Sequence, residues 1–181
     1  MKKDRDFKVL VIHPFDESTQ FLDIIYKDKP YDVITNTTIS KQALKEIMKG
    51  YDKIIMLGHG TPSGLINSTW NGLFIDTTFE DIFRDKETIS IWCNSDRYFK
   101  PRNLKGFHTG MIISEVGEEH VVLGHAPLDE EEIWENMVLF SKVVGECIEK
   151  SPKEMQKYIL EHYNGTDEVS QFNRGNIIVI E

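Results

Sequence analysis

The chain has little cysteine, a deficit of positive charge and no long apolar run, and each shortage excludes a class of protein. Two cysteines among 181 residues, Cys93 and Cys147, are too few for a disulfide framework. The formal net charge of -9 repels phosphate backbones and anionic lipid. No apolar run approaches the roughly 20 residues that a membrane-spanning helix needs. We therefore expect neither nucleic acid nor a membrane as a partner.

The start of the sequence also lacks the pattern of a signal peptide. Residues 1–6, MKKDRD, lead directly into a strand-like segment without an apolar signal core. The expected location is therefore cytoplasmic, where both cysteines are reduced thiols. The composition is otherwise globular, with 40% hydrophobic and 28% charged residues. With no linker or internal repeat, residues 1–181 are predicted to form a single domain.

Apolar runs alternate with helical patterns along the chain. Runs such as FKVLVI and YDKIIML are continuous, as in strands that are buried on both faces of a parallel sheet. Strands are predicted at residues 7–12, 31–34, 51–57, 88–92, 110–114 and 176–180. Helices are predicted at 16–26, 40–50, 79–83, 129–150 and 151–163. The first of them is capped by Asp16 or Ser18. Residues 65–76 are predicted to form a hairpin around Asn71-Gly72, and the glycine-rich residues 58–64 a loop.

This alternation predicts an α/β fold. Helices on both faces of a mostly parallel central sheet form a three-layer sandwich. If the strand order is the common, flavodoxin-like 2-1-3-4-5, the first, third and fourth strands are neighbours. In such folds the site lies beyond the carboxyl ends of the strands, where the sequence places His13, His59, Cys93 and Glu115.

A cysteine and a histidine at neighbouring strand ends have a known chemistry. The imidazole removes the thiol proton, and the thiolate attacks an acyl carbon. A catalytic Cys93 is therefore expected to have a thiolate population at neutral pH that Cys147 lacks. Gly58 and Gly60 beside His59 leave room for a substrate backbone, and their N–H groups are candidates for stabilising an oxyanion. Gly60→Val is expected to lose ligand binding before it loses the fold.

The two motifs resemble those of the caspase-like cysteine peptidases, a group that includes caspases, metacaspases, gingipains, clostripain and CHAT domains. In that group one apolar strand ends in His-Gly, and a later apolar strand ends in the nucleophilic cysteine. Here IIMLGHG precedes ISIWC, and Cys93 follows His59 by 34 positions (93 − 59). The resemblance covers residues 51–96. It implies a full or divergent member of the group, with His59 as general base, Cys93 as nucleophile and a peptide or protein as substrate or partner.

The sequence departs from the group at the positions that set substrate preference. Ile91 stands where members that cleave after lysine or arginine often carry aspartate, and Asn94-Ser95-Asp96 replaces the Arg-Gly that follows the caspase cysteine. Asp96 either lines the first substrate pocket or caps the turn after Cys93. We expect the cap, because an aspartate in a turn usually bonds nearby backbone.

Other interpretations of these residues remain open. The alternative for Cys93 is an unreactive core thiol, and Cys147, at helical spacing with apolar residues, is predicted to be one. Two roles are open for His13: it supports the site or contacts the substrate, or it bonds only its own turn. The same two roles are open for Glu115 and Asp96.

Cofactor and metal sites have weaker support. A zinc site built from His13, His59 and Cys93 has no diagnostic spacing. The 58–64 loop lacks both the Walker lysine and the dinucleotide fingerprint. We therefore expect no cofactor and no metal. The main alternative to a hydrolase is a non-catalytic domain of the same fold that binds a small ligand or a protein. The sequence leaves the oligomeric state open.

Overall fold

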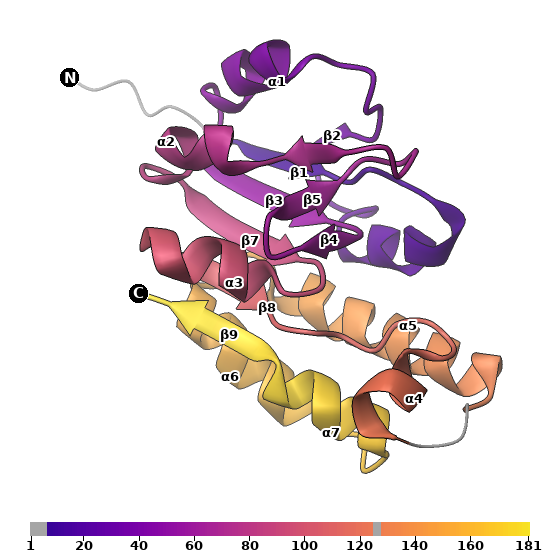
Figure 1. Ribbon diagram of the computed structural model, residues 1–181. Helices are drawn as coiled ribbons and strands as arrows, with labels where there is room; N and C mark the ends of the chain where they lie inside the picture. The colour runs from indigo at the N-terminus through magenta and orange to yellow at the C-terminus, as the bar shows by residue number, and fades with distance from the viewer. Residues whose placement is uncertain (1–6, 125–127) are drawn as a thin grey trace.

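The computed structural model describes residues 7–124 and 128–181 (Figure 1). The expectation drawn from residues 1–6 lies outside this part of the chain. Within the described residues, no helix is both long and apolar enough to cross a membrane.

A six-stranded sheet with the order β2-β1-β3-β7-β8-β9 forms the centre of the molecule. Five strands run parallel, and β9 pairs with β8 in the antiparallel direction. The predicted mostly parallel sheet is thus confirmed. The strands are β1 (Val9–Ile12), β2 (Asp32–Ile34), β3 (Lys53–Leu57), β7 (Glu87–Ile91), β8 (Gly106–Thr109) and β9 (Ile177–Ile180).

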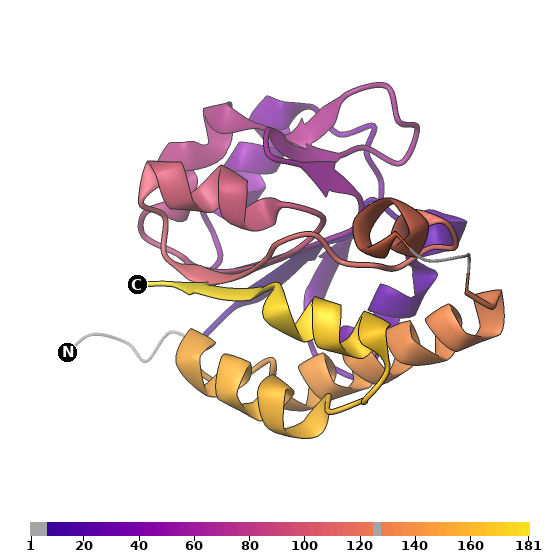
Figure 2. The same cartoon turned by 60° about the horizontal axis from the view of Figure 1, so that its bottom comes forward.

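Helices cover both faces of this sheet, as Figure 2 shows. Alternate residues of β3 enter two separate apolar clusters: Ile55 joins Phe140 on one face, and Ile54 joins Phe99 on the other. The first face is covered by the 3-10 helix η1 (Glu17–Ile25) with α5 (Glu130–Cys147) and α6 (Pro152–His162). The second face is covered by α1 (Lys41–Met48), α2 (Glu80–Phe83) and α3 (Ser95–Phe99). The arrangement is a three-layer α/β sandwich.

Four further helical elements of the described residues are short. They are η2 (Thr77–Phe79), η3 (Lys100–Arg102), α4 (Glu118–Leu123) and α7 (Glu168–Gly175). Neither α4 nor α7 is among the predicted helices, and α3 is also absent from them. Each of these three helices has at most eight residues, so its apolar periodicity covers too few turns to be recognised.

The glycine-rich segment after β3 is not the simple loop that its composition predicts. It contains β4 (Gly60–Thr61) and the start of β5 (Gly64–Ile66), which with β6 (Leu73–Ile75) form a small antiparallel sheet. The predicted hairpin is confirmed as β5 and β6. Its turn is wider than the dipeptide Asn71-Gly72, because the Asn67 N–H donates to the Gly72 carbonyl at 3.0 Å.

The predicted strand at residues 110–114 is wrong. The fifth strand, β8, ends at Thr109, and Ile112 and Ile113, which follow it, are buried without joining the sheet. The side chain of Asn173 replaces the missing strand partner: it accepts from the Ile113 N–H at 2.8 Å and donates to the Ile113 carbonyl at 3.0 Å. An apolar run alone does not distinguish such a segment from a strand.

Gly60 is needed for packing. A Cβ placed at this position would lie 2.0 Å from Cδ1 of Trp92, whose side chain is buried and donates through Nε1 to the Thr61 carbonyl at 3.2 Å. Any side chain at position 60 therefore displaces the indole on which the small sheet packs. This corrects the expectation that Gly60→Val would spare the fold.

We predict that Gly60→Ala lowers the free energy of unfolding by about 2 kcal/mol, since overpacking a filled interior typically costs 1–3 kcal/mol. The control is Gly175→Ala, because a Cβ at position 175 meets no atom within 4 Å. Urea unfolding of the two variants measures the difference. Equal stabilities would contradict the packing role assigned to Gly60.

Candidate active site

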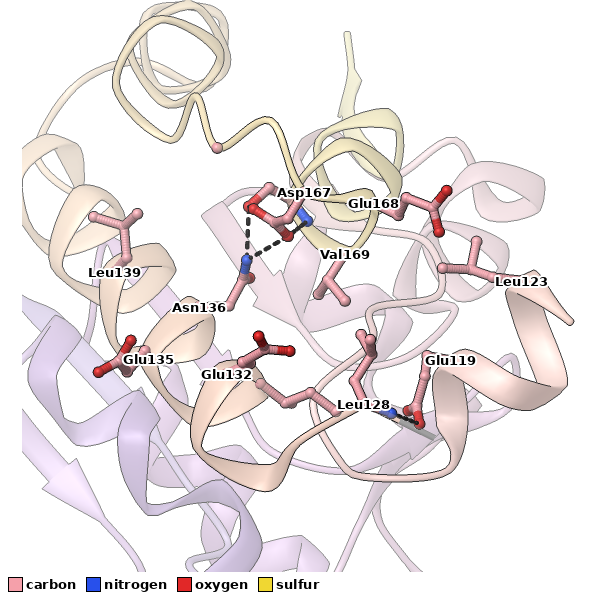
Figure 3. A pocket seen from close by; sticks show the side chains of 13 residues that line it. Glu119, Leu123, Leu128, Glu132, Glu135, Asn136, Leu139, Asp167, Glu168 and Val169 are labelled. Atoms are coloured by element: carbon pink, nitrogen blue, oxygen red, sulfur yellow. Dashed lines mark hydrogen bonds between the residues drawn. The ribbon is translucent and has the colours of Figure 1, made fainter. Parts of the chain in front are cut away.

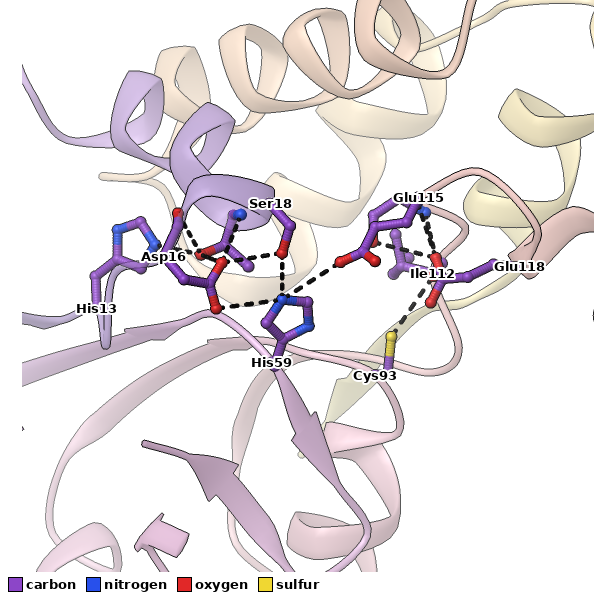
Figure 4. Close-up of polar contacts among 10 residues, drawn as sticks. His13, Asp16, Ser18, His59, Cys93, Ile112, Glu115 and Glu118 are labelled. Carbon is purple, nitrogen blue, oxygen red and sulfur yellow. Dashed lines mark hydrogen bonds and ion pairs between the residues drawn. The ribbon is translucent and has the colours of Figure 1, made fainter. Parts of the chain in front are cut away.

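His59 and Cys93 lie at the ends of neighbouring strands. The pairs Ile12 with Met56 and Leu57 with Ile91 align the carboxyl ends of β1, β3 and β7 at one edge of the sheet. One residue, Gly58, separates His59 from the end of β3, and one residue, Trp92, separates Cys93 from the end of β7. Both side chains line one small pocket of about 20 Å³. Figure 4 shows them side by side, with the Nδ1 edge of the imidazole on the side where Cys93 lies.

The Nε2 atom of His59 is surrounded by oxygen atoms from two other segments. It lies 2.6 Å from Ser18 Oγ, 3.4 Å from Asp16 Oδ2 and 3.4 Å from Glu115 Oε1. Asp16 caps η1 by accepting from the Thr19 N–H at 3.0 Å, so the helix start fixes its position. The first βα connection and the segment after β8 thus converge on the imidazole (Figure 4).

These contacts show which ring nitrogen carries the proton when His59 is neutral. The Ser18 hydroxyl donates to Asp16 Oδ1 at 2.9 Å, so its oxygen accepts from His59 Nε2–H. The carboxylates of Asp16 and Glu115 also only accept when ionised. The proton therefore lies on Nε2 and the lone pair on Nδ1, which makes no hydrogen bond to the other residues drawn in Figure 4. That lone pair is the one available as a base.

The carboxyl of Asp16 is held in its ionised form. Burial acts to raise its pKa, but the hydrogen bonds from Ser18 and Thr19 act against burial, and the pKa lies below its usual value; a positive charge on His59, when the ring is protonated, lowers it further. An ionised Asp16 beside Nε2 favours a positive charge on the ring during proton transfer.

Cys93 is protonated in this arrangement. Its thiol donates to the Ile112 carbonyl at 3.5 Å, and it makes no hydrogen bond to His59 in the described part of the chain. Burial raises the pKa of the Cys93 thiol to about 11, and the charges of Glu118 and Glu115 act in the same direction. The expectation that Cys93 has a thiolate population at neutral pH is therefore wrong.

Cys147 differs from Cys93 in its surroundings. It is fully buried in the apolar cluster under α5, which confirms its assignment to the core. Burial raises the pKa of its thiol to about 12.

His13 lies behind the site and does not line its pocket. It is buried, with Nδ1 2.9 Å from the Tyr26 hydroxyl and Nε2 3.4 Å from Thr19 Oγ1. Because Thr19 Oγ1 in turn donates to Asp16 at 3.1 Å, His13 is connected to His59 through Thr19 and Asp16. Burial lowers the pKa of His13 to about 4, so the ring is neutral at pH 7.

Gly58, one of the two glycines beside His59, does not provide the N–H expected for an oxyanion site. Gly58 has a φ of +134°, a conformation that favours glycine, but its N–H donates to the Ile91 carbonyl at 3.2 Å. This N–H is therefore unavailable to an oxyanion.

Asp96 fits neither of the two roles considered for it. It lies inside the first turn of α3, after Asn94 at the N-cap, and the helix has no side-chain cap. The expected cap is therefore wrong. Asp96 is also absent from the pocket that His59 and Cys93 line, and its Oδ1 is buried without a hydrogen-bond partner among the described residues.

Asp16, Ser18 and Trp70 were not identified as site residues from the sequence. Asp16 and Ser18 were recognised only as helix caps, although they follow the end of β1 as His13 does. The same strand-end rule that selected His13 also applies to them. Trp70 lies in the β5–β6 turn, with its ring centroid 4.5 Å from that of His59. No feature of the sequence indicates that contact.

A wider cleft adjoins this site. Its volume is about 770 Å³, and Ser18 and Glu115, both contacts of His59, lie in its wall. The carboxylates of Glu17 and Glu130 and the half-exposed indole of Trp134 also line it. The cleft is thus open to solvent and acidic.

Figure 3 shows another pocket, of about 510 Å³, between α4, α5 and α7. Its polar groups are largely paired: Glu119 accepts from the Leu128 N–H at 3.0 Å, and Asn136 donates to Asp167 at 3.1 Å. No histidine or cysteine is among its lining residues. Across the described residues, no three histidine, cysteine or carboxylate side chains are grouped as a metal site.

We predict that the protein loses stability as the pH falls below 6.5. His13 and His108 are both buried, and burial lowers their pKa values to about 4 and about 3. The unfolded chain binds protons at these histidines below pH 6.5, whereas the folded chain excludes them. The free energy of unfolding should therefore fall by up to about 2.7 kcal/mol per pH unit between pH 6 and 5.

Urea unfolding at a series of pH values measures this slope. His108→Leu should remove about half of the slope, whereas His162→Ala, a change at an exposed histidine, should leave it unchanged. A stability that is constant from pH 6.5 to 5 would contradict the burial of neutral histidines.

Comparisons with protein-family models, with curated proteins and with solved structures find no match to this chain.

Proposed function

We propose that the protein is a cysteine-dependent hydrolase of the peptidase type, with Cys93 as nucleophile and His59 as general base. The observation that carries the proposal is the position of His59: its ring lines one pocket with Cys93, while Nε2 is bonded to Ser18 and Asp16. The resemblance of residues 51–96 to caspase-like peptidases supports the same pair. Under this proposal the parallel order β2-β1-β3-β7-β8 is the caspase-like arrangement, and the substrate is a peptide or protein in the cytoplasm.

The reaction begins from a neutral thiol. As Sγ attacks the acyl carbon, its proton passes to Nδ1 of His59, and a carbon–sulfur bond forms. The imidazolium is stabilised by the carboxylates of Asp16 and Glu115. It then protonates the leaving amine as the carbon–nitrogen bond breaks, and a water molecule hydrolyses the acyl-enzyme in the reverse sequence.

The pocket needs to open for this reaction. A volume of about 20 Å³ accommodates roughly one water molecule. The Ile112 carbonyl bonds the Cys93 thiol, so a substrate displaces this carbonyl from the sulfur. The adjoining acidic cleft gives access to it from solvent.

A non-catalytic domain that binds a small ligand or a protein is the second candidate. Two observations favour it: the raised pKa of the Cys93 thiol, and the large cleft beside a small dyad pocket. In this alternative Cys93 is a packed thiol, and the cleft is the binding surface.

We predict that iodoacetamide alkylates Cys93 in the native protein faster than Cys147, at a rate that increases with pH towards 11, because the thiolate is the reactive form. His59→Ala should slow alkylation of Cys93 at pH 7 by about 100-fold, the usual contribution of a general base. Peptide mapping by mass spectrometry gives both rates.

Two further variants test the specificity of this effect. His162→Ala removes an exposed histidine on α6 and should leave the rate of Cys93 alkylation unchanged. The wild-type protein should hydrolyse a mixed library of peptidyl aminocoumarins. Cys93→Ser should abolish this hydrolysis. Equally slow alkylation of both thiols, without dependence on His59, would favour the binding domain instead.

A further inference from the structure

The turn between β5 and β6 places an exposed indole against His59. The ring centroids of Trp70 and His59 are 4.5 Å apart, and their planes are inclined by 43°. Trp70 nevertheless remains 60% exposed. The indole therefore covers part of the imidazole while much of its own surface faces solvent.

The backbone of this turn adopts a conformation that few residues take. Trp70 has a φ of +59°, in the left-handed region where residues other than glycine and asparagine are uncommon. Residues held in this way are frequent at ligand sites, where the surrounding structure imposes the conformation.

Asn67 provides that surrounding structure. Its Oδ1 accepts from the N–H groups of Thr69 and Asn71, each at 3.2 Å, and its carbonyl accepts from the Trp70 N–H at 3.1 Å. The Asn67 N–H closes the turn on the Gly72 carbonyl at 3.0 Å. The position of the indole is therefore set by a network of bonds within the turn.

We propose that Trp70 is a substrate-contacting residue that binds an aromatic side chain next to the acyl group held by His59 and Cys93. This assignment rests on the proposed hydrolase and adds a substrate preference to it. An indole binds other aromatic rings edge to face or in offset stacks. The turn itself, residues 67–72 with the sequence NSTWNG, has no charged side chain to pair with a cationic or anionic group.

Binding of blocked amino acids tests the assignment without any reaction at Cys93. N-acetyl-phenylalanine methylamide, N-acetyl-alanine methylamide and N-acetyl-lysine methylamide are titrated into the wild-type protein, and NMR follows the His59 ring and the Trp70 indole. We expect the phenylalanine probe to shift both signals at concentrations about fivefold lower than the other two probes. Trp70→Phe should keep most of this preference, and Trp70→Ala should remove it when followed through the His59 signals.

The control is Leu160→Ala, at a partly exposed position on α6, which should keep the preference. Equal binding of the three probes, preference for the lysine probe, or an unchanged preference in a folded Trp70→Ala protein would each overturn the assignment. An unreactive Cys93 would overturn the hydrolase alone, because the probe titration does not depend on thiol chemistry.

Discussion

The parallel pairing of β1, β3 and β7 is the constraint on which the rest of the structure depends. Because these strands run in one direction and end at the same level, the segments after them emerge together at one edge of the sheet. Asp16 and Ser18 come from the first segment, His59 from the second and Cys93 from the third. The buried strands fix the starting points of these segments, and the start of η1 then fixes Asp16.

Two electrostatic effects oppose each other at this edge. Burial and nearby carboxylates favour the neutral thiol of Cys93, which makes it unreactive at rest. One of these carboxylates, Glu115, acts together with Asp16 to favour a positive charge on His59 and so promotes transfer of the thiol proton. A site of this kind reacts when a substrate brings an acyl carbon to the sulfur, because attack and proton transfer then occur together. Glu115 contributes to both effects, since it belongs to the segment that lies over Cys93.

The sequence predicted the parts of this arrangement that follow from continuous apolar runs and short-range caps. The sheet, a helix cap at Asp16 or Ser18, and the positions of His59 and Cys93 at strand ends are of this kind. It did not predict contacts that join distant segments. The side chain of Asn173 satisfies the backbone of Ile113 and turns an expected strand into an irregular segment. Trp92 fills the space above Gly60, and Trp70 reaches His59 from a turn. Each of these depends on tertiary packing that no local pattern encodes.

The central claim is that the lone pair of His59 lies on Nδ1, the edge of the ring on the side of Cys93, because Ser18, Asp16 and Glu115 accept the proton of Nε2. The ¹⁵N chemical shifts of the two His59 ring nitrogens measure this directly in the neutral ring. The account predicts a protonated Nε2 and an unprotonated Nδ1, with a loss of this bias in the double variant Asp16→Asn, Ser18→Ala. A proton on Nδ1 of the wild-type protein would contradict the account, because His59 would then have no base directed towards Cys93.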